Sequence, residues 1–323
     1  MAATVSVALC THNGARFIEQ QLRSILEQEP APADLVLSDD ASTDDTVAIA
    51  QRVAAEYPET RLRVLRNDPA LGVTANFELA ISATSGDLIA LSDQDDVWHP
   101  GRLATVVTLF AANPDLTVVA SDARLVDAEG QALGGSLLAA IEVGQAERDA
   151  LNGDAAFATL LRRNLLTGAT MVLRRSVLDR ALPFPPSWVH DEWIAAIAST
   201  GGGIRLLDDQ LIDYRQHGAN QIGAERLSLL AKLRRLAEPR RDRNARLLRR
   251  AAALVDRLDT LGLAAELREA ARGKLAHELR RSDLPAGRLR RVLPVLSGLR
   301  AGSYAAYGRG ALDAVRDLVQ PDR

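Results

Sequence analysis

Apolar and polar positions alternate along the first two thirds of the chain in blocks that predict strands followed by helices. Short apolar runs predict strands at 5–10, 34–40, 61–67, 87–93 and 116–127. Apolar residues that recur every three or four positions predict helices at about 17–26, 43–57 and 73–84. Strands that alternate with helices of this length indicate an α/β fold, with a mainly parallel sheet covered by helices.

The pattern changes twice further along the chain. Residues 129–165 form a Gly- and Ala-rich stretch without clear periodicity, which predicts an irregular segment. Strand character returns at 168–175 and 203–218, on either side of a short helix predicted at 191–200. After about residue 225 the chain is rich in Arg, Leu and Ala and reads as nearly all helical. We therefore expect two domains, an α/β domain at 1–225 and an α-helical extension at 226–323.

Charge divides along the same boundary. Residues 226–323 hold 23 Lys and Arg against 11 Asp and Glu, whereas residues 1–225 hold 16 against 31. Leucines and alanines at helical spacing between the arginines of 232–262 predict an amphipathic, cationic helix, broken at Pro239. Such a helix either lies on an anionic membrane or packs its apolar face on the first domain or on a second copy in a homodimer. The diffuse charge and the lack of a recognition motif argue against nucleic acid as a partner.

The cysteine content and the distribution of apolar residues indicate the cellular compartment of the protein. The only cysteine, Cys10, cannot form an internal disulfide, which fits a reducing compartment and a core thiol. The first ten residues lack the basic start of a signal peptide, and no apolar run approaches the roughly 20 residues of a spanning helix. We expect a cytoplasmic protein, either soluble or held at the inner face of the cell membrane.

Polar and acidic residues follow three of the first four predicted strands. The first strand runs into Thr11-His12-Asn13-Gly14, the second ends at Asp39-Asp40, and the fourth runs into LSDQDDVWHP at 91–100. Each segment alone is typical of a turn. Because the carboxyl ends of parallel strands meet at one edge of a sheet, the three together predict a binding site there.

Asp93, Asp95 and Asp96 lie within four positions directly behind an apolar run. Carboxylates driven together at the end of a buried strand repel each other unless a cation joins them. Mg²⁺ and Mn²⁺ take oxygen ligands, and Mg²⁺ typically binds through one or two carboxylates together with substrate phosphates. The segment therefore predicts a divalent cation that neutralises a diphosphate leaving group.

Several spaced motifs together resemble family 2 glycosyltransferases of the GT-A fold. These are VALCTHNGARFIEQQLRSILEQ, LSDDASTDDT, GVTANFELAISATSGDLIALSDQDDVWHPGRL and VHDEW, and the resemblance covers about residues 4–220. DQDDVW, HDEW and DYRQHGANQIGA resemble most closely the rhamnosyltransferase-like members that build bacterial surface polysaccharides. The resemblance implies a metal-dependent inverting hexosyltransferase. Its donor would be a nucleotide-diphosphate sugar, dTDP-rhamnose or a UDP-sugar, and its acceptor a hydroxyl of a glycan or lipid-linked glycan.

The resemblance assigns donor-binding roles to residues at the three strand ends. Thr11 and Asn13 match the loop that contacts the nucleotide in the family. Asp40 matches the aspartate that recognises the pyrimidine base, with Asp39 as its neighbour. Asp93 matches the first acid of the DxD motif and would face the ribose or sugar of the donor, or bind the metal.

The resemblance also assigns the metal and the base. Asp95 matches the second acid of DxD and is the preferred metal ligand, and His217 resembles a C-terminal histidine that reaches the metal or diphosphate. Asp191 matches the catalytic base, with His190 in place of the usual Glu. An inverting displacement needs one carboxylate to remove the acceptor proton, and the alternative is that Asp191 only caps the following helix.

Candidates for acceptor contact are less specific. Trp98 and Trp193 could stack on a sugar, although an aromatic beside an apolar run is more often core. Gly168 could permit close approach of the acceptor, or it could form a turn at the end of a strand. Arg215 could bind a phosphate or form a surface ion pair.

Other functions remain as alternatives. A sugar-nucleotide nucleotidyltransferase would carry a Gly-rich, basic phosphate loop after the first strand, where the chain has THNGARF. A phospho-receiver module would carry acids after that strand and a lysine opposite. A catalytically silent sugar-nucleotide-binding module is disfavoured because Asp40, Asp93, Asp95 and Asp191 are all present.

Overall fold

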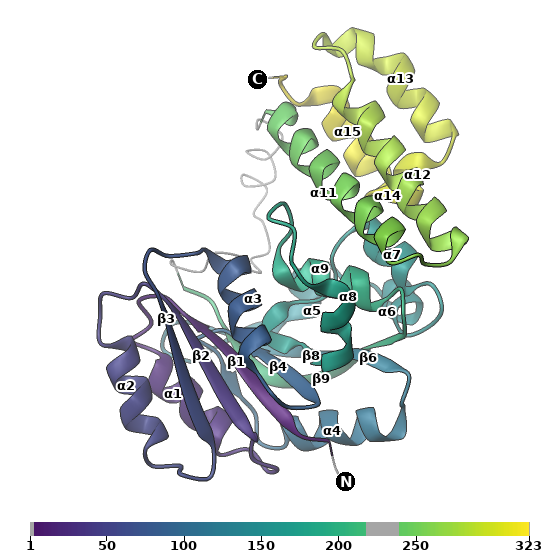
Figure 1. Cartoon of the computed structure of the whole chain (residues 1–323). Helices are drawn as coiled ribbons and strands as arrows, with labels where there is room; N and C mark the ends of the chain where they lie inside the picture. Colours follow the sequence, from purple (N-terminus) through teal and green to yellow (C-terminus); the bar gives the residue numbers. More distant parts are fainter. Residues whose placement is uncertain (1–2, 218–238, 323) are drawn as a thin grey trace. The chain divides into compact units, whose positions relative to one another are not determined.

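A computed structural model describes residues 3–217 and 239–322 (Figure 1). The chain forms two compact units: the described part of the first comprises 3–154 and 165–217, and that of the second 155–164 and 239–322. The predicted boundary near residue 225 lies outside the described residues. The segment 155–164 belongs with the helical unit, although it lies within the predicted α/β domain.

The first unit contains a nine-stranded sheet with the order β3-β2-β1-β4-β8-β6-β9-β5, and β7 pairs with β6. The strands are β1 (Val5–Thr11), β2 (Asp34–Asp40), β3 (Arg61–Asn67), β4 (Leu88–Ser92), β5 (Val97–Trp98), β6 (Leu116–Val126), β7 (Ala132–Ser136), β8 (Val172–Arg174) and β9 (Gly203–Arg215). The first four strands are parallel, and β6 is parallel to β9. The strand β8 is antiparallel to both β4 and β6, so β6 and β9 point the same way as β4.

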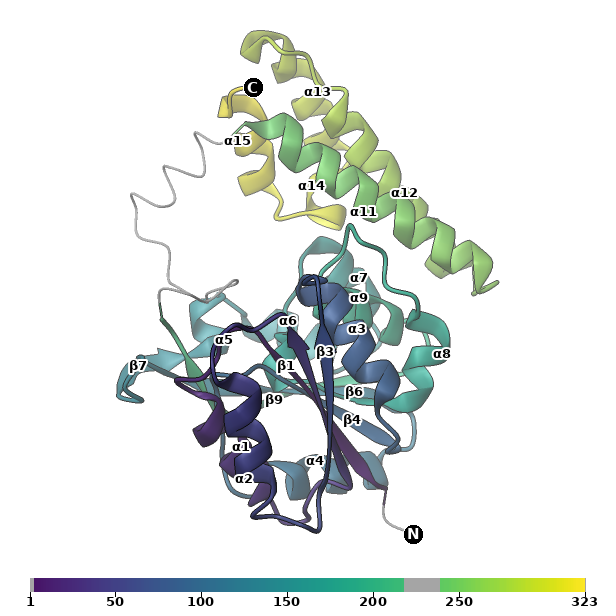
Figure 2. The same ribbon diagram turned by 60° about the vertical axis from the view of Figure 1, so that its left-hand side comes forward.

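Helices cover both faces of this sheet (Figure 2). They are α1 (Ile18–Leu26), α2 (Thr46–Ala54), α3 (Val73–Ala83), α4 (Arg102–Ala112), α5 (Leu137–Ala140), α6 (Gln145–Leu151), α8 (Leu178–Ala181) and α9 (His190–Ala198), with single turns η1 (Gly168–Thr170) and η2 (Arg175–Val177). Alternate residues of a strand face opposite sides, so Val7 and Leu9 join one core cluster with α1, α2 and α4. The helix α3 packs against β1 and β2 on the other face. Strands buried on both faces read as continuous apolar runs, which explains why they were visible in the sequence.

The predicted α/β class is confirmed, and the predicted strands and helices of the first 127 residues are present. The prediction of an irregular segment at 129–165 is wrong, because β7, α5, α6 and α7 (Ala156–Arg162) lie there. The short strand β5 and the helix α4 were not predicted.

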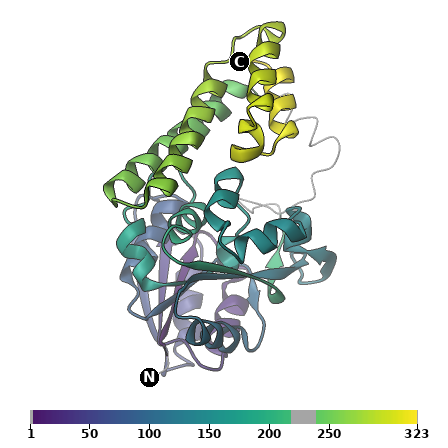
Figure 3. The same cartoon turned by 90° about the vertical axis from the view of Figure 1, so that its right-hand side faces the viewer.

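The second unit is helical (Figure 3). Besides α7 it contains α11 (Arg240–Thr260), α12 (Ala265–Ser282), α13 (Arg288–Arg300), α14 (Ser303–Tyr307) and α15 (Ala311–Val319). The helix α11 begins directly after Pro239 and lies along α12, with Ala251, Leu254 and Leu258 buried. The apolar face predicted for this helix is therefore covered within its own unit. Among residues 3–217 and 239–322, no helix is both long and apolar enough to cross a membrane.

A buried ionic cluster supplements the small apolar core of the second unit. The Asp317 side chain has no exposed surface and pairs with Arg243 and Arg281. Its Oδ2 also accepts a hydrogen bond from the Tyr304 hydroxyl at 2.9 Å. Buried charges are tolerated only when they are paired in this way, so the cluster ties α11, α12 and α15 together.

Candidate active site

The carboxyl ends of β1 and β2 are joined through Asp39. Thr11 and Asp39 are register partners, and the Thr11 hydroxyl donates a 2.7 Å hydrogen bond to Asp39 Oδ1. The Ser42 amide donates to Asp39 Oδ2 at 3.0 Å, and the carboxyl group has no exposed surface. In this structure Asp39 therefore holds the loop after β2 in place, rather than facing solvent.

Asn13 forms the turn after β1. Its φ of +49° lies in the left-handed region, where Asn is among the more tolerated residues. The Asn13 amide donates to the Ser42 hydroxyl at 2.8 Å, and Asn13 Oδ1 accepts from the Thr43 amide at 2.9 Å. The two loops predicted to bind the nucleotide are thus one hydrogen-bonded unit.

Asp40 anchors the loop that leads into α3. Its carboxyl oxygens accept from the amides of Leu71 at 2.7 Å and Gly72 at 2.9 Å, and from Asn67 Nδ2 at 3.2 Å. A carboxylate offers about four acceptor positions, so these three bonds leave room for one further donor.

Gln94 clamps the loop after β4 to the loop after β1. Its Oε1 accepts from the His12 amide at 2.8 Å, and its Nε2 donates to the His12 carbonyl at 3.1 Å. A Cβ at Gly14 would lie 2.2 Å from Gln94 Oε1, so any larger residue there would force the Gln94 side chain to move. Sequence reasoning missed Gln94, and the only available signal was its place between two acids.

The acidic residues predicted to share a site interact electrostatically with one another. Burial, followed by the charges of Asp95 and Asp191, raises the pKa of Asp93 to about 7. Burial and the charges of Asp95 and Asp93 also raise the pKa of Asp96. A cation would relieve this repulsion. Asp191 lies far away in the sequence, and η1 links α9 to the end of β4: the Gly168 amide donates to Asp191 Oδ2 at 3.1 Å, and the Leu91 amide donates to the Met171 carbonyl at 3.0 Å.

Asp96 and Arg215 hold the acidic loop, residues 93–96, in place through hydrogen bonds. Asp96 is buried, and its Oδ1 accepts from the Arg215 amide at 3.0 Å. The buried Arg215 guanidinium donates to the Asp95 carbonyl at 2.7 Å, to the Ala128 carbonyl at 2.9 Å and to Gln20 Oε1 at 2.8 Å. Arg215 is therefore buried and does not lie at the surface, and its guanidinium holds the loop in place.

His217 reaches Asp95. The two side chains are largely buried, with His217 Nε2 2.7 Å from Asp95 Oδ2, and the imidazole stacks on Phe17 at 4.9 Å between ring centroids. At this distance the two groups form a hydrogen bond. Neighbouring ligands of an octahedral ion with bonds of about 2.1 Å lie about 3 Å apart, so only a small movement separates this pair from the spacing of two ligands of one cation. The rest of the resembling segment DYRQHGANQIGA, residues 218–224, lies outside the described residues.

Asp191 sits in the first turn of α9. The N-cap residue of the helix is Val189, so Asp191 does not occupy the cap position, although its carboxylate does bind an amide of the first turn. Asp191 Oδ2 accepts from the Gly168 amide at 3.1 Å, and Oδ1 accepts from the Glu192 amide at 2.7 Å. These bonds orient a half-buried carboxylate whose charge acts on Asp93.

Gly168 and His190 define the space around this carboxylate. A Cβ at Gly168 would lie 2.9 Å from His190 Nε2 and 3.3 Å from Asp191 Cβ. The His190 ring is buried and stacks on Phe77 at 3.9 Å, and burial lowers its pKa. The glycine therefore permits the close approach of η1 to α9.

The two predicted aromatic contacts to the acceptor are corrected. Trp98 is 2% exposed and lies under the Arg102 guanidinium, 3.9 Å from the ring centroid, while burial lowers the pKa of Arg102 to about 9. Trp193 has no exposed surface, and its Nε1 donates to the Ala181 carbonyl at 2.8 Å. Neither indole can stack on a sugar in this structure, and both are core residues. Trp188 is a partly exposed aromatic near Asp191, and the sequence analysis did not select it.

The Cys10 thiol is buried, as predicted for a core residue. Burial raises its pKa, and the charges of Asp93 and Asp40 act in the same direction. A thiol with a raised pKa is a poor nucleophile at neutral pH. The thiol therefore lies close enough to the ends of β2 and β4 to interact electrostatically with Asp40 and Asp93.

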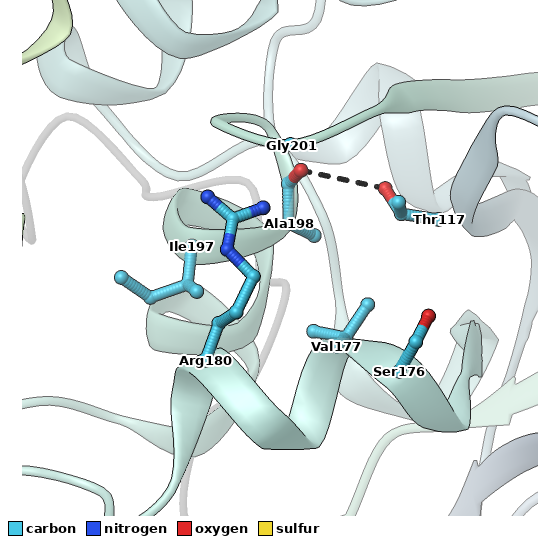
Figure 4. A pocket seen from close by; sticks show the side chains of 7 residues that line it. All are labelled: Thr117, Ser176, Val177, Arg180, Ile197, Ala198 and Gly201. Carbon is cyan, nitrogen blue, oxygen red and sulfur yellow. Dashed lines mark hydrogen bonds between the residues drawn. The ribbon is translucent and has the colours of Figure 1, made fainter. Parts of the chain in front are cut away.

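A cavity of about 180 Å³ lies elsewhere in the first unit (Figure 4). It is lined by Thr117, Ser176, Val177, Arg180, Ile197, Ala198 and Gly201. Thr117 belongs to the amino end of β6, and its hydroxyl donates to the Ala198 carbonyl at 3.4 Å at the end of α9. Arg180 Nη2 donates to the Thr200 hydroxyl at 2.7 Å. None of the predicted site residues lines this cavity.

The protein residues at the acidic edge do not form a complete metal cage. Within the described ranges, no group of three or more His, Cys, Asp or Glu side chains is arranged to hold a metal ion. The pair Asp95 and His217 nevertheless fits a cation that draws its other ligands from phosphate and water, which is common for Mg²⁺ and Mn²⁺.

The sequence matches known relatives over about two thirds of its length. An uncharacterised glycosyltransferase of Nostoc sp. is 26% identical over 223 residues, which is 67% of this chain and 66% of that protein. The dTDP-rhamnosyl transferase RfbG of Shigella flexneri is 32% identical over 108 residues, which is 32% of this chain and 37% of that protein. The first alignment thus spans just under two thirds of the relative.

Two solved structures share the fold. TarS 1–349 of S. aureus in complex with UDP-GlcNAc has a TM-score of 0.58 at 18% identity, covering 94% of this chain and 89% of TarS 1–349. The mannosyltransferase PcManGT of Pyrobaculum calidifontis, in complex with GDP-Man and Mn²⁺, has a TM-score of 0.53 at 19% identity, covering 98% and 79%. The GT-A-like arrangement and the C-terminal helices are therefore confirmed. Residues 6–178 match the family described as glycosyl transferase family 2, and the chain belongs to that family.

Proposed function

We propose that the protein transfers a sugar, with inversion, from a nucleotide-diphosphate donor to an acceptor hydroxyl. The observation that carries this proposal is that η1 links Asp191, at the start of α9, to the end of β4, which Asp93 and Asp95 follow directly. Residues from the start of α9 and the end of β4 share one negative cluster, although nothing in the local sequence requires them to meet. A cluster of this kind suits a cation, a diphosphate and a base at one point.

Asp95 and His217 would hold the cation, with Asp93 beside it. When bound, Mg²⁺ or Mn²⁺ would neutralise the charge that develops on the leaving diphosphate. Imidazole together with carboxylate suits Mn²⁺ better than Mg²⁺, which prefers oxygen ligands only. Asp95 also receives support through its backbone, because its carbonyl accepts from Arg215 Nε at 2.7 Å.

Asp191 is the proposed general base. Inversion is a single in-line displacement, so one carboxylate must remove the acceptor proton on the side opposite the leaving group. The amides of Gly168 and Glu192 donate to its two oxygens, and hydrogen bonds to the charged form favour that form. A fixed, ionised carboxylate in a partly buried site is what this step requires.

The hydrogen-bonded loops of Thr11, Asn13, Asp39 and Asp40 are proposed to bind the nucleotide. Asp40 retains one acceptor position, which suits an N–H of a pyrimidine base. Similarity to the dTDP-rhamnosyl transferase RfbG supports dTDP-rhamnose as the donor, and the fold shared with TarS supports a UDP-sugar as the second candidate. A glycan or lipid-linked glycan is the proposed acceptor.

A ligand screen tests the proposal. We expect dTDP-rhamnose or a UDP-sugar to raise the melting temperature only when Mn²⁺ or Mg²⁺ is present, since a bound ligand stabilises by mass action. Asp95→Asn should remove the metal dependence. Asp213→Asn is the matched control, because Asp213 Oδ1 also lies 2.7 Å from a histidine, His99 Nε2, outside the site.

The product distinguishes the proposed function from its alternatives. Inverting transfer gives a glycoside of opposite anomeric configuration to the donor, which proton NMR measures directly. Formation of a nucleotide sugar from a nucleoside triphosphate would instead indicate a nucleotidyltransferase. Metal-dependent binding without any turnover, across a range of glycan acceptors, would indicate a silent binding module.

A further inference from the structure

The helix α13 exposes an apolar face. Leu289 is 90% exposed and Leu293 is 78% exposed, far more than is usual for leucine in a folded domain. Val292, Leu296 and Leu299 are also exposed, and the five residues recur at the spacing of one helix face. A surface helix normally turns its apolar stripe inward. Because these five side chains are exposed, no other part of the described residues covers the stripe.

The inward side of α13 shows that the helix is firmly seated in this orientation. Arg291 is 1% exposed, and its guanidinium donates to the carbonyls of Pro285 at 2.7 Å and Gln320 at 2.7 Å. Val295 has no exposed surface and joins the small core of the second unit. The helix therefore buries an arginine and presents leucines to the outside, the reverse of the usual pattern.

The segment that contains α13 carries charge of a single sign. Residues 284–312 contain five arginines and no Asp, Glu or Lys. On α13 itself Arg288, Arg290 and Arg300 are exposed, near the two ends of the leucine stripe. An apolar stripe combined with exposed arginines matches a surface that is apolar inside and anionic at its rim.

We propose that the α13 face, defined as Leu289, Val292, Leu293, Leu296 and Leu299 with Arg288, Arg290 and Arg300, binds an anionic lipid surface. The helix has 13 residues, too few for the roughly 20 that span a bilayer, so it would lie in the plane of the head groups. The leucines would enter the acyl boundary, and the arginines would pair with lipid phosphates.

A second copy of the chain fits this face less well. In a two-fold dimer the same patch meets itself, so the arginines of one copy would lie near those of the other, without an acid among residues 284–312 to pair with them. A membrane rich in anionic lipid satisfies both the leucines and the arginines. The proposal does not depend on the proposed activity, and it concerns α13 rather than the arginine-rich α11, whose apolar residues pack on α12.

Vesicle flotation of the full chain tests the proposal. We expect binding to phosphatidylglycerol-containing vesicles, weaker binding at high salt, and little binding to phosphatidylcholine alone. The double variant Leu289→Ser/Leu293→Ser should reduce partitioning about tenfold or more, since each leucine loses its apolar burial. Leu133→Ser is the matched control, because Leu133 is 52% exposed on β7 in the other unit.

A second pair of variants separates charge from apolar contact. Arg288→Gln/Arg290→Gln should weaken binding to anionic vesicles several-fold and flatten its salt dependence. All of these side chains are exposed, so unchanged thermal melts are expected and serve as the folding control. Failure of the wild-type chain to float with anionic vesicles would overturn the proposal. So would a wild-type dimer that dissociates in the leucine variant while lipid binding stays unchanged.

Discussion

Replacement of Gly168 by Ala probes the contact that positions Asp191. The backbone of Gly168 is not in the left-handed region, so only space opposes a methyl group. The added Cβ would lie 2.9 Å from His190 Nε2, whereas ordinary contacts begin at 3.4 Å. Relief therefore requires a shift of about 0.5 Å in η1 or α9, and this shift stretches the hydrogen bond from the Gly168 amide to Asp191.

The expected loss of unfolding free energy in Gly168→Ala depends on how far the His190 ring can move. The His190 ring is buried and stacked on Phe77, so it cannot swing away as an exposed side chain would. Overpacking of this kind costs about 1–3 kcal/mol of unfolding free energy, or about 2–12 °C in melting temperature for a unit of this size. A misplacement of about 1 Å can reduce turnover about 100-fold, so a shift of half that size should reduce kcat about tenfold.

Thermal unfolding and the rate of nucleoside diphosphate release measure the two effects. Gly144→Ala is the control, because no atom lies within 4 Å of its added Cβ and φ is −84°. In a His190→Ala background the methyl group should fit, and the double-mutant cycle should show a coupling of about 1 kcal/mol or more. A Gly168→Ala variant with wild-type stability and kcat would refute the reasoning.

Two further predictions concern the helical unit. His277 is 1% exposed, and burial lowers its pKa to about 4. In the unfolded chain this imidazole takes up a proton near pH 6.5, whereas in the folded chain it does not. The free energy of unfolding should therefore fall by up to about 3 kcal/mol between pH 6.5 and pH 4. Urea titrations should show a shallower loss for His277→Gln, and an identical pH profile in this variant would contradict the assignment. Asp317→Asn leaves Arg243 and Arg281 without their shared charge and should cost about 3–5 kcal/mol, whereas Tyr304→Phe removes one hydrogen bond and should cost about 1 kcal/mol. Equal losses in the two variants would show that the ionic cluster contributes no more than a neutral contact.

The parts of the fold that were predictable have strong local signals. Strands β1, β2 and β4 are buried on both faces, so each contains a mostly apolar run that ends in polar residues. The position of Asp93 and Asp95 at the sheet edge follows from that pattern together with the rule that parallel strands end on one edge.

The parts that were not predictable depend on contacts between distant residues. Alanine and glycine at 129–165 give little contrast between buried and exposed positions, so the helices there left a weak pattern. The loop clamp of Gln94 on His12 joins segments that are far apart along the chain. Trp98 and Trp193 could not be separated into contact and core residues, because an indole beside an apolar run fits both.

The C-terminal helices illustrate the same limit. Arginine content pointed to an anionic partner, but α11, α12 and α13 all share that composition. Only packing shows that α11 buries its apolar residues while α13 exposes Leu289 and Leu293. Which face of a helix is exposed depends on the neighbouring elements that cover its other face, and composition alone does not show this.

Donor binding and sugar transfer by Asp191→Asn test the central claim most directly. The amide keeps an oxygen for the Gly168 amide but cannot accept the acceptor proton. With Mn²⁺ present, kcat should fall about 100-fold to 10,000-fold while the Kd for the donor stays within about threefold of wild type. Asp208→Asn, at an exposed acid paired with Arg148, should leave both unchanged. An Asp191→Asn enzyme that transfers sugar at nearly the wild-type rate would contradict the role of this carboxylate as the base.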